Sequence, residues 1–258
     1  MATEDHHFRK PPVSLSEKEF AARSRRSFMT LGLGAAGAYF GWHWLRTRMD
    51  EDGLPSTFRR VLDFNRTVTS EALFSEGHLA PSFPPSAIKP LRPNGDYGLG
   101  DDVDTEKWRL QLAPFSKPHA KQSLSLAQIR QLPKTEHITQ FKCVEGWSTV
   151  VHWGGVRLSD FTRHFAPGSE KAQYVGLVTP DEEYYVGIDM PSALHPQTLL
   201  CYEMNGASLT DEHGAPLRLV IPVKYGIKNL KRIGSITYTD ERPDDYWAER
   251  GYDYYAAL

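Results

Sequence analysis

The chain of 258 residues contains only two cysteines, so a disulfide scaffold cannot define its fold and a hydrophobic core must do so. With 40% hydrophobic and 12% aromatic residues, it can bury a sizeable core in one large domain or two small ones. One of the two thiols, Cys143, lies in the segment FKCVEGWS, residues 141–148. A single thiol in this setting is better suited to hold a metal as a thiolate than to form a structural bridge.

The second thiol and the net charge further limit the kinds of protein that this chain can be. Cys201 lies in the apolar run TLLCY, residues 198–202, where we expect a buried free thiol. A disulfide between Cys143 and Cys201 stays open as the alternative if the protein is exported to an oxidising compartment. The formal net charge is −2, with acidic and basic residues interspersed, so nothing indicates a nucleic-acid partner.

Residues 1–45 indicate a targeting segment rather than part of the fold. The paired arginines in SRRSFM, residues 24–29, precede an uncharged stretch that ends at Leu45, and this resembles a twin-arginine export signal to the periplasm. That route carries proteins that are already folded. A protein that receives its cofactor in the cytoplasm needs such a route, because it must fold around the cofactor before export. A retained membrane anchor is the alternative, because residues 27–45 nearly cover a hydrocarbon core of ~30 Å. Four glycines weaken such a span and AGA at residues 36–38 resembles a cleavage site, so both outcomes stay open.

The remainder divides into an extension and a main domain. Residues 46–104 are rich in Pro, Gly and polar residues, which predicts an irregular extension that packs on the core of the 105–258 domain. Periodicity in that domain predicts helices over residues 125–132 and from Val156 onward. It predicts strands over 108–112, 137–144, 172–178, 184–188, 198–204, 217–223 and 235–239. No strand–helix alternation or repeat is present, so the expected class is α+β.

The segment around Cys143, together with WGGV at residues 153–156, resembles the molybdenum-ligand loop of the sulfite oxidase family in its bacterial, haem-free form. The resemblance implies a sulfite-oxidase-type fold with mixed sheets and short helices. It implies that residues 105–258 form a molybdopterin-binding catalytic domain with a molybdenum-molybdopterin cofactor. Cys143 would then be the catalytic residue and the thiolate ligand of the metal. A buried core cysteine is the ordinary alternative at such a position.

A stretch of cations provides a second signature. Residues 218–232 contain five basic residues and no acidic one, namely Arg218, Lys224, Lys228, Lys231 and Arg232. Composition alone leaves two interpretations open, a solvated basic strand edge or a site for the phosphate of a cofactor. The surrounding pattern resembles the family's pterin-binding signature. By that resemblance the cofactor-binding residues would be His213, Arg218, Asn229, Leu230 and Lys231.

Further matches extend the resemblance from about residue 94 to residue 254. The turn NGDYG, residues 94–98, lies where the family's first cofactor-contacting segment lies, so Asn94 and Tyr97 are implied to contact the cofactor. Thr179 matches a threonine at an equivalent strand end. The chain departs from the family at Gly98, where relatives have a Glu, and at Asn229, where some relatives have a small residue.

The resemblance also implies the kind of reaction. We expect an oxidoreductase that transfers an oxygen atom or an electron pair to or from a small-molecule or protein-bound oxidised substrate. A separate partner would exchange the electrons, such as a membrane b-type cytochrome or a soluble c-type cytochrome. We expect a monomer without a C-terminal β-sandwich dimerisation domain. The alternative from another class is a metal-free, membrane-tethered binding or assembly protein that keeps the fold.

Overall fold

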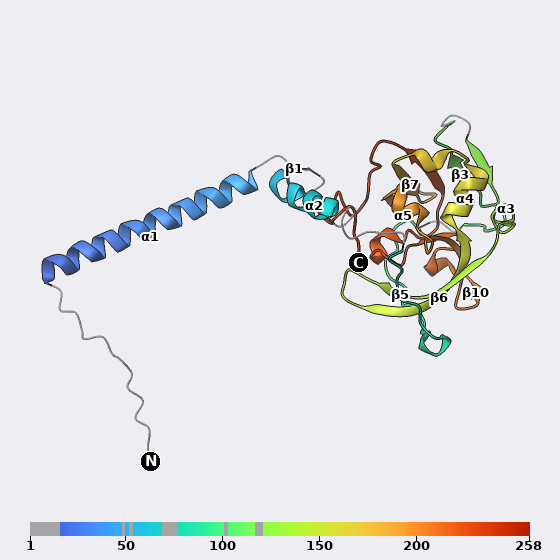
Figure 1. Ribbon diagram of the computed structural model, residues 1–258, viewed down its shortest axis with the longest axis horizontal. Coiled ribbons are helices and arrows are strands. Elements are labelled where there is room, and N and C mark those ends of the chain that lie inside the picture. Colours follow the sequence, from blue (N-terminus) through green and yellow to red (C-terminus); the bar gives the residue numbers. More distant parts are fainter. Residues whose placement is uncertain (1–15, 48–49, 52–53, 69–76, 101–102, 117–120) are drawn as a thin grey trace, which may run out of the picture. The chain divides into compact units, whose positions relative to one another are not determined.

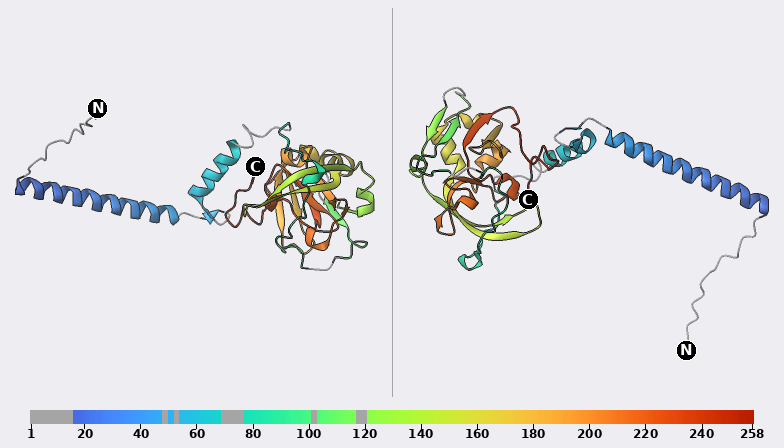
Figure 2. Two further views of the ribbon diagram at one scale, coloured as in Figure 1. Left: turned by 90° about the horizontal axis from the view of Figure 1, so that it is seen from below. Right: turned by 180° about the vertical axis from the view of Figure 1, so that it is seen from behind.

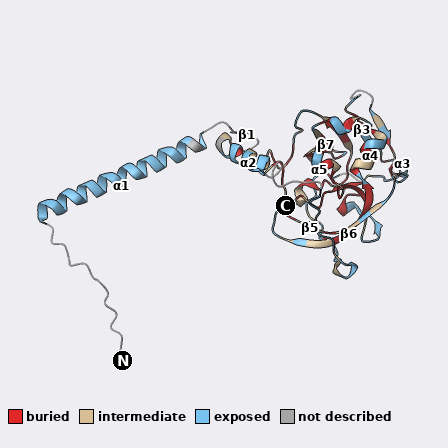
Figure 3. Cartoon of the chain, viewed as in Figure 1, coloured by how far each residue is buried: buried red, intermediate tan, exposed pale blue. Residues whose placement is uncertain are grey.

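The structure is a computed structural model that describes residues 16–47, 50–51, 54–68, 77–100, 103–116 and 121–258. Two compact units, residues 1–49 and 50–258, make up the chain (Figure 1). The first unit holds α1 (Glu17–Arg46), whose start is fixed by a capping box between Ser16 and Glu19. The described side chains of α1 are exposed along its whole length (Figure 3). Of the helices in the described ranges, none is long and apolar enough to cross a membrane.

Two five-stranded sheets form the second unit. One has the strand order β4–β3–β12–β7–β8 and is antiparallel except between β3 and β12. The other has the order β10–β9–β6–β5, with β11 also paired to β9. The strands are β1 (Asp50–Glu51), β2 (Leu54–Pro55), β3 (Leu110–Ala113), β4 (Gln122–Leu124), β5 (Thr135–Lys142), β6 (Ser148–Arg157), β7 (Tyr174–Val178), β8 (Tyr185–Asp189), β9 (Leu199–Met204), β10 (Ala207–Ser208), β11 (Arg218–Val220) and β12 (Ser235–Thr239).

Short helices connect these strands, and the α+β class is confirmed. The α-helices of this unit are α2 (Ser56–Val68), α3 (Leu126–Ile129), α4 (Leu158–Phe165) and α5 (Met190–Leu194). The 3₁₀ turns are η2 (Pro85–Ala87), η3 (Ser169–Lys171), η4 (Asp211–His213) and η5 (Gly226–Lys228).

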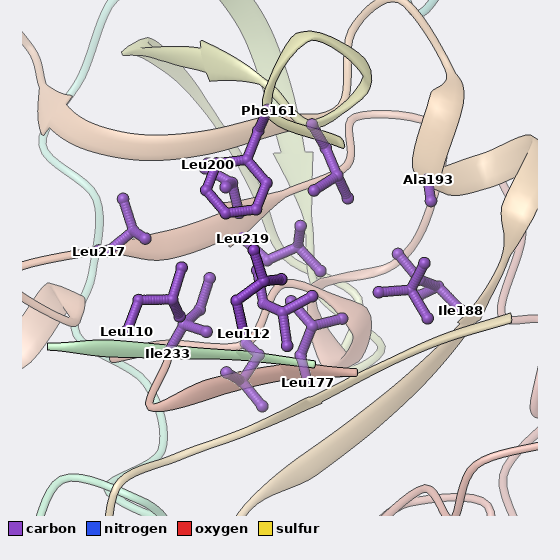
Figure 4. Close-up of a cluster of buried hydrophobic side chains, with 14 of the residues drawn as sticks. Leu110, Leu112, Phe161, Leu177, Ile188, Ala193, Leu200, Leu217, Leu219 and Ile233 are labelled. Carbon is purple, nitrogen blue, oxygen red and sulfur yellow. The ribbon is translucent and has the colours of Figure 1, made fainter. Parts of the chain in front are cut away.

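The main core lies between the two sheets (Figure 4). Leu112 of β3 and Leu177 of β7 face Leu200 of β9 and Leu219 of β11, and Phe161 of α4 covers the group. All five side chains are fully buried. Each such burial contributes roughly 1.5–3 kcal/mol of hydrophobic free energy, so this core fixes how the sheets face each other.

Part of the extension pairs with the second sheet, and the extension is not irregular throughout. The backbone N–H of Phe83 donates to Ile138 of β5, and that of Lys89 donates to Val150 of β6. Residues 56–68 form the amphipathic helix α2, so the prediction of an irregular stretch is wrong there. Residues 56–68 contain no Pro or Gly, and the turn signals at residues 82–85 and 91–95 follow the helix.

The hairpin of β5 and β6 is the longest strand pair, and the sequence did not predict β6. The two glycines in β6, Gly154 and Gly155, are poor strand formers, yet packing demands one of them. A Cβ atom on Gly155 would lie 2.2 Å from the carbonyl oxygen of Leu200 in β9, so only glycine lets the two strands approach here. The ladder between β6 and β9 shifts its register at this point. Because β6 runs to Arg157, α4 begins at Leu158 rather than at Val156.

Candidate active site

Cys143 lies in the tight loop that joins β5 to β6. Its backbone N–H donates to the carbonyl of Trp147 at 2.9 Å, and the N–H of Gly146 donates back to the carbonyl of Cys143 at 3.1 Å. Gly146 has a φ of +88°, which favours glycine at this corner. The side chain is buried, with 8% exposed, and it faces a cavity. The hairpin thus holds one thiol in a fixed place at a sheet end.

The cavity beside this thiol has a volume of about 150 Å³. It brings together six of the nine residues that the sequence predicts for the site, although they come from four separate segments: Asn94, Tyr97, Cys143, Arg218, Asn229 and Lys231. The rest of its wall consists of Gly95, Phe141, Val144, Glu145, Tyr184, Gly226, Ile227, Trp247 and Tyr252.

The thiols of the chain are separate and protonated in this environment. Both cysteines are free, so the disulfide alternative is not formed. Burial raises the pKa of Cys143. The side-chain amide of Asn94 donates to its sulfur at 3.8 Å. Burial raises the pKa of Cys201 to about 11, and its thiol donates to the carbonyl of Glu203. A bound metal would supply the positive charge that Cys143 needs to ionise.

Arg218 of β11 is the deepest cation at the cavity, with 1% of its surface exposed. Its two terminal nitrogens donate to the carbonyls of His213 at 3.0 Å and Asn229 at 3.3 Å, and the guanidinium lies 5.0 Å from the ring centre of Trp153. In the described part of the chain, Nε has no partner and no carboxylate pairs with the group. Burial lowers its pKa to about 10. A buried guanidinium of this kind is suited to bind an anion.

Lys231 completes the cationic side of the cavity. Its Nζ donates to the carbonyls of Asn94 and Gly95, both at 2.9 Å, and so ties the 94–97 turn to the end of the cationic stretch. Burial and the nearby charge of Arg218 lower the pKa of Lys231 to about 8. The Asn94 side chain in turn reaches towards Cys143. These contacts link the thiol, the turn and Lys231, and Arg218 lines the same cavity.

Two other lysines of the stretch have a different role. Lys228 pairs with Asp245 at 2.5 Å, and both are almost fully buried. Lys224 lies 3.6 Å from Asp189 and donates to the carbonyl of Tyr255 at 2.7 Å. Neither lysine lines the cavity. The interpretation of a solvated strand edge is wrong for both, because they hold the C-terminal segment against the domain.

Thr179 lies outside this cavity. It is buried and lines a separate hollow of about 440 Å³ with Trp108 and Gly234, and its hydroxyl donates to Asp181. Gly98 packs against it, because a Cβ atom at residue 98 would lie 2.4 Å from Thr179 Cγ2. The glycine also has a φ of +77°. The local packing therefore leaves no room at residue 98 for the Glu that the resemblance implies there.

His213 and Leu230, which the sequence also predicts for the site, do not line the cavity. His213 is buried, its carbonyl accepts from Arg218, and its ring Nδ1 has no partner among the described residues. Burial, followed by the charges of Arg218 and Lys231, lowers the pKa of His213. Leu230 belongs to the main core, and its carbonyl accepts from the N–H of Leu219. Leu230 thus fixes the strand beside the cations, whereas His213 is a buried polar group without its full set of partners.

Sequence reasoning missed the aromatic part of the wall. Tyr184, Trp247 and Tyr252 line the cavity, and the rings of the last two lie 5.1 Å apart. Tyr97 and Tyr252 are 50% and 40% exposed, so the rim is aromatic and open to solvent. A signal existed, because half of residues 246–255 are Tyr or Trp. Such a density of large rings near one another is typical of a binding surface.

The family model described as the oxidoreductase molybdopterin binding domain matches residues 98–247, more than half of the chain. The chain belongs to this family, the sulfite oxidase family of molybdenum enzymes. It is therefore an oxidoreductase with the sulfite-oxidase-type fold, and its cofactor is molybdenum-molybdopterin. This outcome favours the enzyme over the metal-free binding protein.

The names of curated relatives are also those of oxidoreductases. The chain is 34% identical to a protein from Azospira oryzae provisionally named protein-methionine-sulfoxide reductase subunit YedZ1, over 80% of this chain and 78% of that protein. It is 35% identical to the protein-methionine-sulfoxide reductase catalytic subunit MsrP of Campylobacter jejuni, over 61% of this chain and 59% of the relative. MsrP of Xanthomonas campestris is 36% identical, over 60% of this chain and 55% of the relative. The chain thus spans under two thirds of these MsrP proteins.

One solved structure shows a weak likeness. The sulfane dehydrogenase SoxCD from Paracoccus pantotrophus superposes with a TM-score of 0.48 at 16% identity, over 55% of this chain and 40% of that chain.

The residues at the cavity fit a molybdopterin. The anionic group of such a cofactor needs cations, and Arg218 offers a buried guanidinium whose Nε has no partner among the described residues. Within the same described ranges, no group of three His, Cys, Asp or Glu residues could hold a metal. A pterin dithiolene would supply soft sulfur ligands to a metal beside Cys143.

Proposed function

We propose that this chain is an exported reductase of methionine sulfoxide, free or in proteins, with Cys143 as the thiolate ligand of molybdenum. A separate redox partner, such as a b-type or c-type cytochrome, would supply the electrons. One observation carries the proposal: a buried thiol lines the same cavity as a buried guanidinium that pairs with no carboxylate among the described residues. The names of the relatives support the choice of substrate.

The cavity suggests how the cofactor would be held. Arg218 and Lys231 would bind its anionic group, because the first is a buried cation, the second is a partly buried one, and both donate to backbone carbonyls at the cavity. The turn at Asn94 and Tyr97, to which Lys231 donates, would contact the pterin. When bound, the cofactor supplies a metal that takes up and releases electron pairs. The protein supplies the thiolate, the orientation and the charge balance.

The rim favours a neutral sulfoxide over an anionic substrate. Tyr97, Trp247 and Tyr252 offer aromatic surface to the methyl and methylene groups of a methionine side chain. The carboxylate of Glu145 lines the same cavity, and it would repel a dianion such as sulfite. In the reduction, one sulfoxide, two electrons and two protons give one thioether and one water. The sulfur is reduced, its bond to oxygen breaks, and the partner is oxidised.

Export is part of the proposal. The paired arginines of residues 24–29 and the uncharged run after them lie in α1. A signal for folded proteins suits a chain whose cofactor sits against a buried cation, because the domain must close around the cofactor before transport. Fractionation of cells that produce either the full chain or its double variant Arg25→Lys and Arg26→Lys tests whether the protein is exported.

The test of the function is a substrate screen on the purified holoprotein with an artificial electron donor. We expect turnover with methionine sulfoxide and little with sulfite. Cys143→Ser should abolish turnover and keep the fold, as measured by circular dichroism, because serine offers no soft donor to molybdenum. Full activity of the serine variant, or turnover with sulfite alone, would refute the proposal. X-ray absorption at the molybdenum edge would show one sulfur ligand fewer in that variant.

A further inference from the structure

An arginine from outside the family-matched residues reaches the wall of the cavity. Arg59 of α2 is 2% exposed, and its Nη2 donates to the carbonyl of Ala248 at 2.8 Å. Its Nη1 donates to the carbonyl of Tyr252 at 3.3 Å. These partners lie 189 and 193 residues further along the chain. In Figure 2 the dark red C-terminal segment passes beside α2 in both views.

The segment that Arg59 holds carries two aromatic residues of the cavity. Trp247 and Tyr252 line the cavity with Cys143, and they close a turn in which the N–H of Tyr252 donates to the carbonyl of Trp247 at 2.9 Å. The start of the turn is anchored separately, because the N–H of Ala248 donates to the buried carboxylate of Asp245. The far end at Tyr252 is 40% exposed. Arg59 thus bridges the anchored start and the exposed end.

The chemistry of the contact explains why an arginine is found there. A guanidinium presents several donors in one rigid plane, so it can bind two carbonyls that lie on one turn at the same time. A lysine offers a single nitrogen and can hold them less rigidly. Arg60, the next residue of α2, is exposed. The helix therefore places one of two adjacent arginines in the domain and leaves the other in solvent.

The packing of α2 separates this role from general stability. Arg59 is the one buried side chain among those that the structure describes in α2. Three apolar side chains of the helix, Phe58, Val61 and Phe64, are exposed. Neither hydrophobic core cluster of described residues contains a residue of α2. Loss of Arg59 should therefore leave the core intact.

We propose that Arg59 is a positioning residue that holds Trp247 and Tyr252 in place at the cavity and thereby sets the affinity for bulky sulfoxide substrates. The choice of substrate rests on the proposed function, whereas the positioning of the two rings does not. A substrate that extends past the rim contacts both rings, so it depends on their position. A small sulfoxide that enters the cavity alone depends on them less.

The kinetic test compares Arg59→Ala and Arg59→Lys with Arg60→Ala as the matched control in the full-length holoprotein. For a peptide that contains methionine sulfoxide, we expect Arg59→Ala to raise KM about tenfold with kcat and molybdenum content unchanged. Arg59→Lys should give an intermediate KM, and Arg60→Ala should match the wild type. The KM for dimethyl sulfoxide should change much less. An unchanged peptide KM, or activity that falls only in proportion to molybdenum content, would overturn the proposal.

A second measurement works without any substrate. Acrylamide quenching of tryptophan fluorescence reports the exposure of Trp247, and we expect Arg59→Ala to increase it. The same substitution in a Trp247→Phe background should then produce no increase, which assigns the change to that ring. If no sulfoxide is reduced by the wild type, the proposed function fails, and quenching alone decides the role of Arg59. Equal quenching in wild type and Arg59→Ala would show that the arginine does not position the ring.

Discussion

The cationic stretch from Arg218 to Arg232 contains two kinds of cation. Lys224 and Lys228 each lie beside a carboxylate and hold the C-terminal segment. Arg218 and Lys231 have backbone carbonyls as their hydrogen-bond acceptors and line the cavity beside the thiol. All four come from one run without an acidic residue, and Arg218 is as deeply buried as the two lysines that have carboxylate neighbours.

The difference teaches where an anion belongs. Removing a charge from water costs several kcal/mol unless a partner offsets the cost, so each buried cation should have an opposite charge nearby. Asp189 and Asp245 provide it for the two lysines. For Arg218 the described residues provide none, and the missing charge matches that of a cofactor phosphate. The pairing of a cation, rather than its presence in a basic run, distinguishes a structural role from a binding role.

The largest expected effect breaks a paired cation. Lys228→Met leaves Asp245 buried without its counter-ion, so we expect the free energy of unfolding to fall by about 3–5 kcal/mol. Urea unfolding of the purified protein measures this loss. Lys228→Met combined with Asp245→Asn should recover part of it, because the uncompensated charge is gone. A loss below about 1 kcal/mol, as for a surface ion pair, would contradict the assignment.

A second effect concerns pH. Burial lowers the pKa of Lys224 to about 7 from 10.5, so between these values the folded chain binds fewer protons than the unfolded chain. The contribution of Lys224 therefore makes stability rise with pH across this window, because deprotonation relieves the cost of the buried charge, which is fully present below about 7. Lys224→Met should remove a rise of roughly 1.4 kcal/mol per pH unit from unfolding curves recorded across the window. Parallel pH profiles for both proteins would argue against it.

The smallest effect on stability, together with a selective effect on cofactor binding, is expected for Arg218 and Lys231, whose hydrogen-bond acceptors are backbone carbonyls. Arg218→Met should weaken cofactor binding roughly ten- to hundredfold, the equivalent of about 1.5–3 kcal/mol for hydrogen bonds to a charged group. Lys231→Met should act in the same direction and less strongly, because its side chain is only partly buried. Molybdenum per folded protein is the measurement, and Lys228→Met is the control that should retain a full complement. Equal molybdenum in Arg218→Met and wild type would remove the distinction between the two pairs.

Local patterns predicted most of the strands because their signals are short-range. Residues 235–239 were predicted with the observed bounds of β12, since apolar and polar residues alternate there. The strand at β11 is shorter than predicted, because Pro222 has no N–H to continue the ladder. The strand β6 could not be read from propensity, because its glycines are explained only by the approach of β9. The helix α2 was missed because the Pro, Gly and polar residues of the surrounding extension suggested a loop.

The site was predictable where a motif carries the chemistry. Cys143, Arg218 and Lys231 were found by resemblance, and the structure brings them to one cavity. The carboxylate partners of Lys224 and Lys228 could not be foreseen, because they lie on other segments of the chain. The same holds for Arg59, whose acceptors are backbone carbonyls and leave no trace in the sequence. The roles of the individual cofactor-binding residues stay predictions until the variants above are measured.

Gly155 has a consequence well away from its own strand. It pairs with Cys201 of β9, and Cys201 pairs with Arg218 of β11, so three neighbouring backbones place the guanidinium in register. A methyl group at residue 155 would meet the Leu200 carbonyl and push β9 outward, carrying β11 with it. If Arg218 binds the cofactor phosphate as proposed, Gly155 would influence that affinity without lining the cavity, because the spacing of the strands sets the position of the guanidinium.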